Sequence, residues 1–397
     1  MKLRTAQDSL KSGLCIGCGL CKYLDSSIEM TERNGLMMPN RIPTNKAIND
    51  ICPSIGYDLV KEANIIFGEK RKLFEIGTYR NIYLAHSNSK ELLDNASSGG
   101  IMTSIACYML EKGIVDGVIC NKFEIINNHV RTATFIAHDK NDLLMSQGSK
   151  YAPTTTLSIL GKIKLTPQNR YLLIGTPCQI AGFRLASKFD KQLSSQIVLC
   201  IANFCGGYRD FREIDFFVRK IAGFQTVSFF RHRGGGQPGS MLIINDEEKY
   251  FNYPYPEYAK LSPFVKNERC TLCMDATGEL ADISCGDAWL DKTKSSSYPW
   301  SIVISRSEKG EIFLQEMESA NFITINNEIA SDEVVKSQRY NIKSKKYRQY
   351  KRIRVRDLLL LKSPNWYDHF DVKDGSYLEE LRIMLSKLKA RRKEPKI

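Results

Sequence analysis

The sequence predicts a mixed α/β fold in three parts: an N-terminal cysteine-containing module over residues 1–62, a central α/β core over 75–330 and a basic helical extension over 331–397. Three observations lead to this prediction. The start of the chain is rich in loops and cysteines, the centre alternates apolar strands with amphipathic helices, and the end is rich in Lys and Arg. With 397 residues, 43% of them hydrophobic, the chain can bury a sizeable core.

The composition argues against several classes of protein. No apolar run approaches the roughly 18 to 20 residues that cross a bilayer. The segment from Met1 to Leu14 lacks the continuous apolar stretch of a secretory signal, so we expect a cytoplasmic protein. Twelve cysteines in a reducing compartment indicate metal or redox chemistry and not disulfides.

The net charge of +13 is concentrated at the end of the chain. From Lys336 onward, 19 Lys or Arg stand against 7 Asp or Glu, so the part that holds the cysteines is nearly neutral. A nucleic-acid enzyme would carry basic charge across its working face, so nucleic acid is not an expected partner. We interpret residues 343–356 as a solvated basic face; docking of an acidic electron carrier, or peripheral contact with an anionic membrane surface, are the alternatives.

Each element of the core is predicted from its periodicity. The predicted strands span residues 81–86, 115–120, 171–174, 197–201, 226–230 and 241–245, and the predicted helices span 100–112, 179–189 and 211–221. The glycine-rich segment 234–238 is expected to be a loop between two strands. A closing helix near 376–392 is expected to place five apolar residues on one face: Leu378, Leu381, Met384, Leu385 and Leu388.

The first cysteine motif predicts a cluster of the ferredoxin kind in the N-terminal module. Cys15, Cys18 and Cys21 have the C-x2-C-x2-C spacing that lets one short loop hold three corners of a [4Fe–4S] cube, and Cys52, before Pro53, is the expected distant fourth ligand. Four thiolates also bind zinc well, but zinc sites more often use two separated pairs.

A second cysteine motif predicts a second cluster. Cys270 and Cys273 form a C-x2-C pair, which supplies only two ligands. The best further donors are Cys178 and Cys205, which follow probable strands. The competing ligands are Cys200 and Cys285, and the expected core residues are Cys107 and Cys120.

Two short segments suit an anionic cofactor. Ser97, Ser98, Gly99 and Gly100 precede a predicted helix, whose free amides attract phosphate, although an ordinary helix cap is the simpler interpretation. The segment 148–151 places a cation, a hydroxyl and an aromatic ring together.

Six ordered motifs between about Cys15 and Asp287 together carry a family resemblance. They are CIGCGLC at 15–21, SSGG at 97–100, GSKY at 148–151, GTPCQ at 175–179, CTLC at 270–273 and ADISCGD at 281–287. The chain resembles the coenzyme F420 hydrogenase/dehydrogenase beta-subunit family, which is also similar to plant 7-hydroxymethyl chlorophyll a reductase.

The resemblance implies a flavin-binding core that holds FAD next to [4Fe–4S] chemistry, and it strengthens the prediction of two clusters. The implied cofactor-binding residues are Ser97, Ser98, Gly99, Gly100, Thr103, Gly148, Ser149, Lys150, Tyr151 and Asp287. The implied cluster ligands are Cys15, Cys18, Cys21, Cys52, Cys178, Cys205, Cys270 and Cys273.

We therefore expect an iron–sulfur flavoprotein oxidoreductase that moves electrons between a low-potential carrier such as ferredoxin, two [4Fe–4S] clusters, FAD and a small organic substrate. One alternative is a beta subunit of a larger dehydrogenase with coenzyme F420 as the hydride partner, and another is a zinc-stabilised nucleic-acid-binding protein. A partner subunit or a homo-oligomer is compatible with either redox hypothesis.

No catalytic residue is assigned from the sequence. His86, His232 and His369 have no recognisable partner, and Asp287 and Trp289 are most simply a turn aspartate and a core tryptophan.

Overall fold

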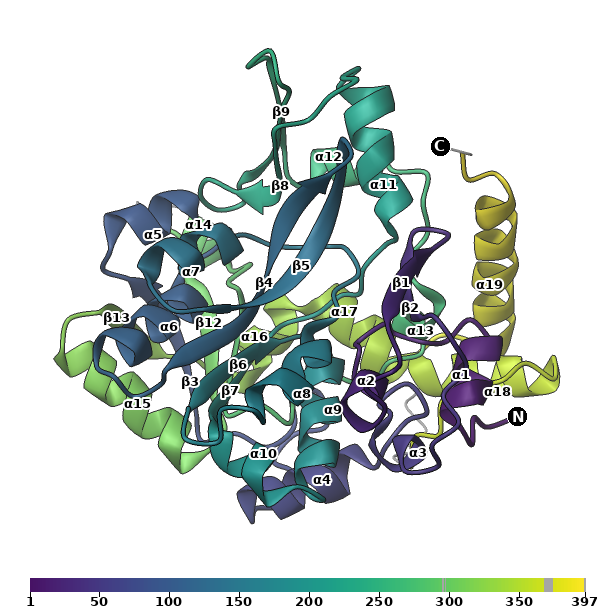
Figure 1. Ribbon diagram of the computed structural model, residues 1–397, viewed down its shortest axis with the longest axis horizontal. Helices are drawn as coiled ribbons and strands as arrows, with labels where there is room; N and C mark the ends of the chain where they lie inside the picture. Colours follow the sequence, from purple (N-terminus) through teal and green to yellow (C-terminus); the bar gives the residue numbers. More distant parts are fainter. Residues whose placement is uncertain (295, 297, 368–373, 396–397) are drawn as a thin grey trace.

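The computed structural model describes residues 1–294, 296, 298–367 and 374–395. A large central sheet carries helices on both faces, a small sheet lies above it, and the first and last parts of the chain lie together at one side (Figure 1). This mixed α/β architecture confirms the predicted fold class. No helix of the described part of the chain is both long and apolar enough to span a bilayer.

The central sheet combines a parallel middle with antiparallel edges. Its strand order is β13-β3-β12-β11-β7-β6-β4-β5, and β4, β6, β7 and β11 are parallel neighbours in the order β4-β6-β7-β11. The strands are β3 (Asn81–Ser87), β4 (Gly117–Ile126), β5 (His129–Ala137), β6 (Tyr171–Gly175), β7 (Ile197–Asn203), β11 (Ile283–Asp287), β12 (Ser301–Ser305) and β13 (Ile323–Glu328).

The parallel strands are apolar because both of their faces are covered. Successive side chains point to opposite faces, so Leu172 and Leu199 belong to one core and Leu173 and Cys200 to the other. The helices of the first face are α5 (Lys90–Asn95), α6 (Ile101–Glu111), α7 (Lys140–Ser146) and α15 (Glu308–Ser319). The helices of the second face are α4 (Leu59–Phe67), α8 (Leu160–Ile163), α9 (Pro177–Ser187) and α10 (Lys191–Gln196).

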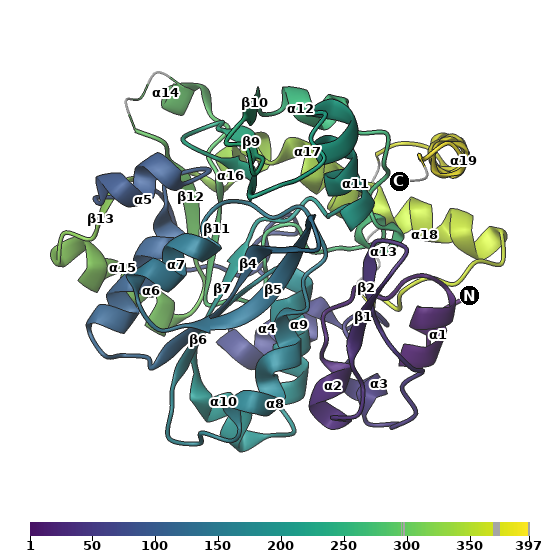
Figure 2. The same ribbon diagram turned by 45° about the horizontal axis from the view of Figure 1, so that its top comes forward.

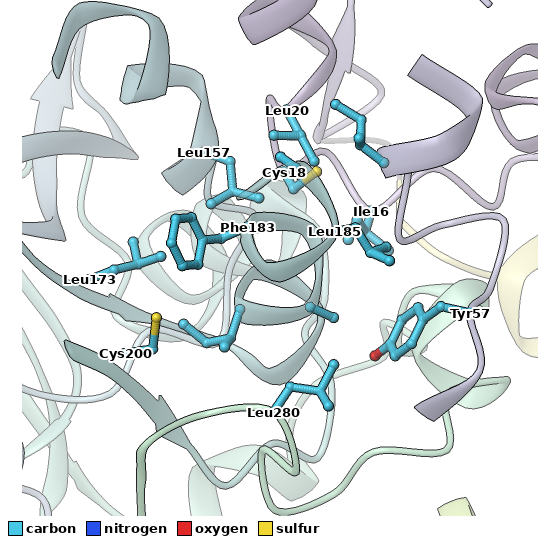
Figure 3. Close-up of a cluster of buried hydrophobic side chains, with 14 of the residues drawn as sticks. Ile16, Cys18, Leu20, Tyr57, Leu157, Leu173, Phe183, Leu185, Cys200 and Leu280 are labelled. Carbon is cyan, nitrogen blue, oxygen red and sulfur yellow. The ribbon is translucent and has the colours of Figure 1, made fainter. Parts of the chain in front are cut away.

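Helix α9 joins the N-terminal module to the central sheet. A capping box of Thr176 and Gln179, with Pro177 in the first turn, starts the helix directly after β6. Figure 3 shows side chains of this core, with Phe183 between Leu173 of the sheet and the N-terminal segment that holds Cys18. The module therefore shares a hydrophobic core with the sheet.

A small antiparallel sheet with its own hydrophobic cluster lies above the central one (Figure 1). Its strands are β8 (Phe229–Gly234), β9 (Ser240–Ile244) and β10 (Tyr250–Pro254), and the helices beside it are α11 (Phe211–Phe216), the π-helix η2 (Phe217–Ile221) and α12 (Glu257–Lys260). The glycine-rich segment 234–238 connects β8 to β9, as predicted.

The N-terminal module and the C-terminal extension pack side by side, as both views show (Figures 1 and 2). The module contains α1 (Ala6–Lys11), α2 (Cys21–Leu24), β1 (Met30–Arg33), β2 (Leu36–Pro39) and α3 (Ile48–Ile51). The extension contains α16 (Ser331–Ser337), α17 (Arg339–Ile342), the π-helix η3 (Lys343–Tyr347), α18 (Gln349–Leu358) and α19 (Tyr377–Arg392). The amino terminus donates to Asp357 Oδ1 at 2.6 Å, and the Leu3 amide donates to the Ser363 carbonyl at 2.8 Å.

One expectation for the extension is wrong and another is completed by the structure. The helix near 376–392 is present, as predicted, and the structure adds that Leu378, Leu385 and Leu388 are exposed and that only Met384 of the five apolar residues is buried. The segment 343–356 is not a solvated basic face, because four of its cations, Lys345, Lys346, Arg352 and Arg356, are buried. Periodicity shows which residues share a face, but it does not show whether a partner covers that face.

Most core elements lie where periodicity predicts them, with two differences. The strand expected at 115–120 extends to Ile126 and forms a long hairpin with β5, and the strand expected at 226–230 is β8, shifted toward Gly234. Polar and apolar residues of the hairpin are alike only partly buried, so the alternation is weak there.

A buried arginine connects three segments beneath the sheet. The Arg306 guanidinium, 1% exposed, donates to the Ile76 carbonyl at 2.8 Å, the Thr277 carbonyl at 3.1 Å and Ser284 Oγ at 3.0 Å. The acceptors are buried, so water could not replace the guanidinium if the side chain were removed. The side chain therefore fixes the segment before β3 to the start of β11.

We predict that Arg306→Met lowers the free energy of unfolding by about 3 kcal/mol, because several buried acceptors lose their donor. Denaturant unfolding at matched cofactor content measures this as a lower midpoint at unchanged slope. The control Arg80→Met removes a half-exposed side chain whose nearest carboxylates lie 3.9 and 4.0 Å away, and should cost less than about 0.5 kcal/mol. Equal losses in the two variants would contradict this account of Arg306.

Candidate cofactor site

A cavity of about 530 Å³ lies at the carboxyl edge of the parallel strands. Gly175 at the end of β6, Asn203 at the end of β7 and Asp287 at the end of β11 all line it. This is the edge at which open α/β sheets bind ligands, because the loops that follow neighbouring parallel strands converge there. The volume is in the range of small-molecule and cofactor sites.

The two segments predicted to contact a cofactor meet in this cavity. Nine of the ten predicted cofactor-binding residues line it: Ser97, Ser98, Gly100, Thr103, Gly148, Ser149, Lys150, Tyr151 and Asp287. Gly99 lies behind the wall, where a Cβ would approach the Ala85 carbonyl oxygen to 2.5 Å and the Ser301 nitrogen to 2.7 Å. Its role is close backbone packing, which only glycine permits.

The turn before α6 is not an ordinary serine cap. Gly100, at φ +71°, is the N-cap residue, and no side chain caps the first turn of the helix. The serines bond elsewhere: Ser97 Oγ lies 3.0 Å from Ser149 Oγ, and Ser98 Oγ lies 3.1 Å from Ser301 Oγ. The amides of the first turn and the helix dipole are thus available to an anionic group in the cavity.

Lys150 is held by the protein itself. Its Nζ donates to the carbonyls of Ser146 at 2.6 Å and Gly148 at 3.1 Å, at the end of α7. Burial lowers the pKa of Lys150 to about 8. The predicted contact of its ammonium with a cofactor phosphate stays a prediction.

Arg233 organises the wall of the cavity, and the sequence did not single it out. The guanidinium, 1% exposed, donates to Asp287 Oδ2 at 2.6 Å and to the Ser97 carbonyl at 2.6 Å. It also lies over the rings of Tyr255, at 4.6 Å, and Trp289, at 5.3 Å. One cation thus connects the turn before α6, the end of β11 and two aromatic rings.

The expected roles of Asp287 and Trp289 need correction. Asp287 is more than a turn residue, since its carboxylate fixes the buried Arg233. Trp289 is not a core residue: it is 39% exposed and lines the cavity.

Of the histidines, His232 lines the cavity, the His86 Nδ1 lies 2.8 Å from the Ser87 carbonyl oxygen, and His369 lies outside the described residues.

His232 presents a hydrogen-bond donor to the cavity. Its Nδ1 accepts from the Tyr151 amide at 3.3 Å, so the neutral ring carries its proton on Nε2. Burial, together with the charges of Lys150 and Arg209, lowers the pKa of His232 to about 3, so the ring is neutral at physiological pH. Among the described residues, the buried Nε2 has no partner.

Two more residues of the cavity wall have buried polar atoms without a hydrogen bond to another described residue. They are Gln147 through Oε1 and Tyr258 through its hydroxyl. Such atoms are costly unless a ligand or water pairs with them. Together with the free amides and the aromatic rings, they fit a ligand that is anionic at one end and planar and polar at the other.

The first cysteine set, which we define as Cys15, Cys18, Cys21 and Cys52, is brought together by the fold. Burial raises the pKa of these thiols, and the charge of neighbouring thiolates raises the pKa of Cys15, Cys18 and Cys21 further. The Gly17 amide, at φ +69°, donates to Cys15 Sγ at 3.5 Å. Buried thiols that raise one another's pKa need bound positive charge to ionise.

The second cysteine set, Cys178, Cys205, Cys270 and Cys273, also converges. Burial raises the pKa of Cys178 to about 12, and the thiolates of the other three members raise it too. The Gly207 amide, at φ +103°, donates to Cys205 Sγ at 3.3 Å. No three His, Cys, Asp or Glu side chains of the described ranges converge at the spacing of ligands on a single metal ion.

The competing ligands Cys200 and Cys285 are placed differently. After burial, the charges that act on Cys200 come from Arg184, Asp282 and Lys309, and burial alone raises the pKa of Cys285. Cys200 is absent from the cavity lining, whereas Cys285 lines the cavity with Cys178, Cys205 and Cys270, so the choice of ligands for the second set stays a prediction. Cys107 and Cys120 are buried core residues, as predicted, and Cys120 also lines the cavity.

The two cysteine sets and the cavity are neighbours. Cys178, Cys205 and Cys270 line the cavity. Tyr208 is near both sets: its hydroxyl donates to the Ile16 carbonyl at 3.1 Å, and its pKa is raised by burial and then by thiolates of both sets. Tyr208 and Ile16 also line the cavity, so the cavity, the second set and the edge of the first set are neighbours.

A buried arginine fastens the ligand segments of the two sets to each other. Arg269, next to Cys270, donates to the carbonyls of Ser54 at 2.9 Å and Pro53 at 2.8 Å, directly after Cys52. Its guanidinium lies over the Trp366 ring at 5.0 Å. The distance between the sets is therefore fixed by a buried contact.

Comparison with known proteins identifies the family. Residues 82–161 match the model for the N-terminal part of the coenzyme F420 hydrogenase/dehydrogenase beta subunit, and residues 168–331 match the model for its C-terminal part. The beta subunit of coenzyme F420 hydrogenase from Methanococcus voltae is 26% identical over 260 residues, which are 63% of this chain and 85% of that protein.

Two further relatives extend the comparison. The coenzyme F420-dependent sulfite reductase of Methanocaldococcus jannaschii is 24% identical over 84% of this chain and 49% of its own length. A chain of the F420-reducing [NiFe] hydrogenase complex from Methanosarcina barkeri shares the fold, with a TM-score of 0.56 and 19% identity over 73% of this chain and 97% of that chain. The chain belongs to the coenzyme F420 hydrogenase/dehydrogenase beta-subunit family.

Proposed function

We propose that the chain is an electron-transfer oxidoreductase that holds a [4Fe–4S] cluster on each cysteine set and FAD in the cavity, with coenzyme F420 as its two-electron partner. The observation that carries this proposal is the shared wall: Cys178, Cys205 and Cys270 line the same cavity as the uncapped first turn of α6. A flavin exchanges two electrons as a hydride and single electrons with a cluster, and this is the chemistry that the bound group would supply.

The residues of the chain would divide the binding of FAD between them. The first-turn amides of α6 would hold phosphate, and Arg233 would keep the turn and the aromatic wall in place. The His232 Nε2–H would donate to a carbonyl or a ring nitrogen of the ligand, since Nδ1 is already occupied. The Cys270 side of the cavity would exchange electrons with the second set, and Tyr208 lies near both sets.

The names of the relatives support coenzyme F420 as the partner. They include an F420 hydrogenase subunit, an F420-dependent sulfite reductase and a subunit of F420-dependent formate dehydrogenase. Coenzyme F420, first weighed as the alternative, therefore becomes the leading proposal. A subunit role is part of it, because the chain that shares the fold comes from a hydrogenase complex.

A second candidate is the ferredoxin-dependent reduction of a small organic substrate. It is favoured by the first cysteine set, which precedes the matched residues 82–331 and gives a one-electron carrier a place of entry. Both candidates share the cofactors and differ in the partner that reduces or oxidises them.

We predict that the protein purified without oxygen contains about eight irons, eight sulfides and one FAD per chain. Cys270→Ala should lose about half of the iron, because one ligand of the second set is removed. The control Cys107→Ala removes a buried thiol outside the cavity and both sets, and should keep all of it. Zinc without flavin would instead support the zinc-stabilised binding protein.

We predict that Arg233→Met loses FAD during gel filtration, since the turn before α6 and Asp287 lose their shared cation. Flavin fluorescence after denaturation of the purified protein measures the retained fraction. Arg170→Met, on a half-exposed side chain far from the cavity, is the control and should retain FAD. Full retention in Arg233→Met would contradict the proposed role.

We predict that reduced coenzyme F420 bleaches the flavin of the oxidised protein within a single mixing experiment, because hydride transfer needs only the cavity. Stopped-flow absorbance under anaerobic conditions follows this step, with reduced ferredoxin as the comparison. Bleaching by ferredoxin and not by coenzyme F420 would favour the second candidate.

A further inference from the structure

The C-terminal extension closes over the loop that holds Cys270 and Cys273. Four of its side chains donate to this loop: Lys345 Nζ to the Asp275 carbonyl at 2.8 Å, Gln349 Nε2 to the Leu272 carbonyl at 3.2 Å, Trp366 Nε1 to the same carbonyl at 2.8 Å, and Arg352 Nη1 to the Thr271 carbonyl. The extension begins where the match to the family models ends, at residue 331. The contact is therefore an addition to the matched core.

Most cations of this segment have a carboxylate partner. Lys346 pairs with Glu279, Arg352 with Glu380 at 2.9 Å, and Arg356 with Glu268 at 2.5 Å. Each of these buried charges is balanced within the protein, so it adds little field at the cysteines.

Lys345 is different, because no ion pair of its ammonium occurs among the described residues. The residue is 4% exposed and bonds to a neutral carbonyl. Cys273 Sγ lies 3.5 Å from that same Asp275 carbonyl oxygen, so the ammonium and the sulfur are neighbours. A buried cation without an ion pair is costly, and the anions that act on it most strongly are the thiolates of the second set, followed by the Asp275 carboxylate.

The electrostatics agree with this placement. Burial acts to lower the pKa of Lys345, but the thiolates of the second set, Cys273 first, outweigh burial and raise it. The side chain is 4% exposed and absent from the cavity lining, so it contacts the Cys270 loop within the protein and not from the cavity. Water does not screen it there.

We propose that Lys345 is a positioning residue whose buried ammonium stabilises the reduced, more negative state of a cluster held by the second cysteine set and so raises its reduction potential. This inference rests on the proposed function only in requiring a cluster at that set. Reduction adds one electron to the cluster, supplied in the test by dithionite through mediator dyes, and neither forms nor breaks a bond.

The test is an EPR-monitored redox titration of the anaerobically purified protein. Lys345→Gln keeps a donor for the Asp275 carbonyl but removes the charge, and should make reduction at least about tenfold less favourable, a downward shift of about 59 mV for one electron. Lys345→Arg keeps the charge and should restore the potential to near that of the unchanged protein. The potential of the other cluster should move much less.

Two controls separate charge from structure. Gln349→Met removes a buried, uncharged donor to the same loop and should leave the potential in place. Lys343→Gln removes a half-exposed lysine of the same segment, whose Nζ pairs with Asp374 at 3.4 Å, and should give a much smaller shift because that carboxylate and water screen it. Equal shifts in Gln349→Met or Lys343→Gln would overturn the proposal, as would an unchanged potential in Lys345→Gln.

Iron analysis keeps the two hypotheses apart. If Cys270→Ala loses no iron, no cluster occupies the second set and the proposed function fails with the inference. If that iron is lost but Lys345→Gln leaves the potential unchanged, only the inference fails. If Lys345→Gln does not fold with its cluster, Lys345→Met replaces it as the variant without charge, and its potential is compared with that of Lys345→Arg. A potential for Lys345→Arg far below that of the unchanged protein would overturn the proposal.

Discussion

The parallel pairing of β6, β7 and β11 is the constraint on which the site depends. Parallel neighbours end at the same edge, so the loops after them bring Cys178, Cys205 and Asp287 to one cavity although more than a hundred residues separate the first from the last. The sheet can keep this order only because both faces are buried, by α6 and α15 on one side and α9 on the other. The core thus determines the position of the candidate ligands.

Buried positive charge is the second organising feature. Arg233 joins the segments of the cavity wall, Arg269 joins the two cysteine sets and Arg306 joins the segment before β3 to the start of β11. Each guanidinium has several donors in a fixed plane, which suits backbone carbonyls from different segments. These basic side chains therefore have an internal role and do not serve the surface.

The structure brings the residues of each predicted cysteine set and of the cofactor segments together, because these groups depend on local motifs, while their roles as ligands stay predictions. The spacing of Cys15, Cys18 and Cys21 and the pair at Cys270 persist in the fold, and all but Gly99 of the predicted cofactor-binding residues line the cavity. The three domain boundaries and the assignment of clusters and FAD stay predictions. What could not be predicted depends on long-range contact.

Arg233 and His232 illustrate that limit. Both residues precede three glycines, and this pattern predicts a loop. It does not predict that β8 brings the two side chains to the cavity wall beside β11 and α6. The exposed leucines of α19 show the same limit. A pattern of apolar residues predicts which side chains share a helix face, but it does not predict which surface, if any, covers that face. Both cases turn on packing between elements far apart in sequence.

The closure of the Cys270 loop by the extension has a consequence for how the protein is made. Residues 345–366, which seal this loop, follow it along the chain and are therefore translated after it. The first cysteine set emerges early, whereas the second remains uncovered until the end of synthesis. Insertion of the proposed cluster at the second set would therefore have to precede the folding of the extension over it, and a shortened chain would leave that set exposed to solvent and oxygen.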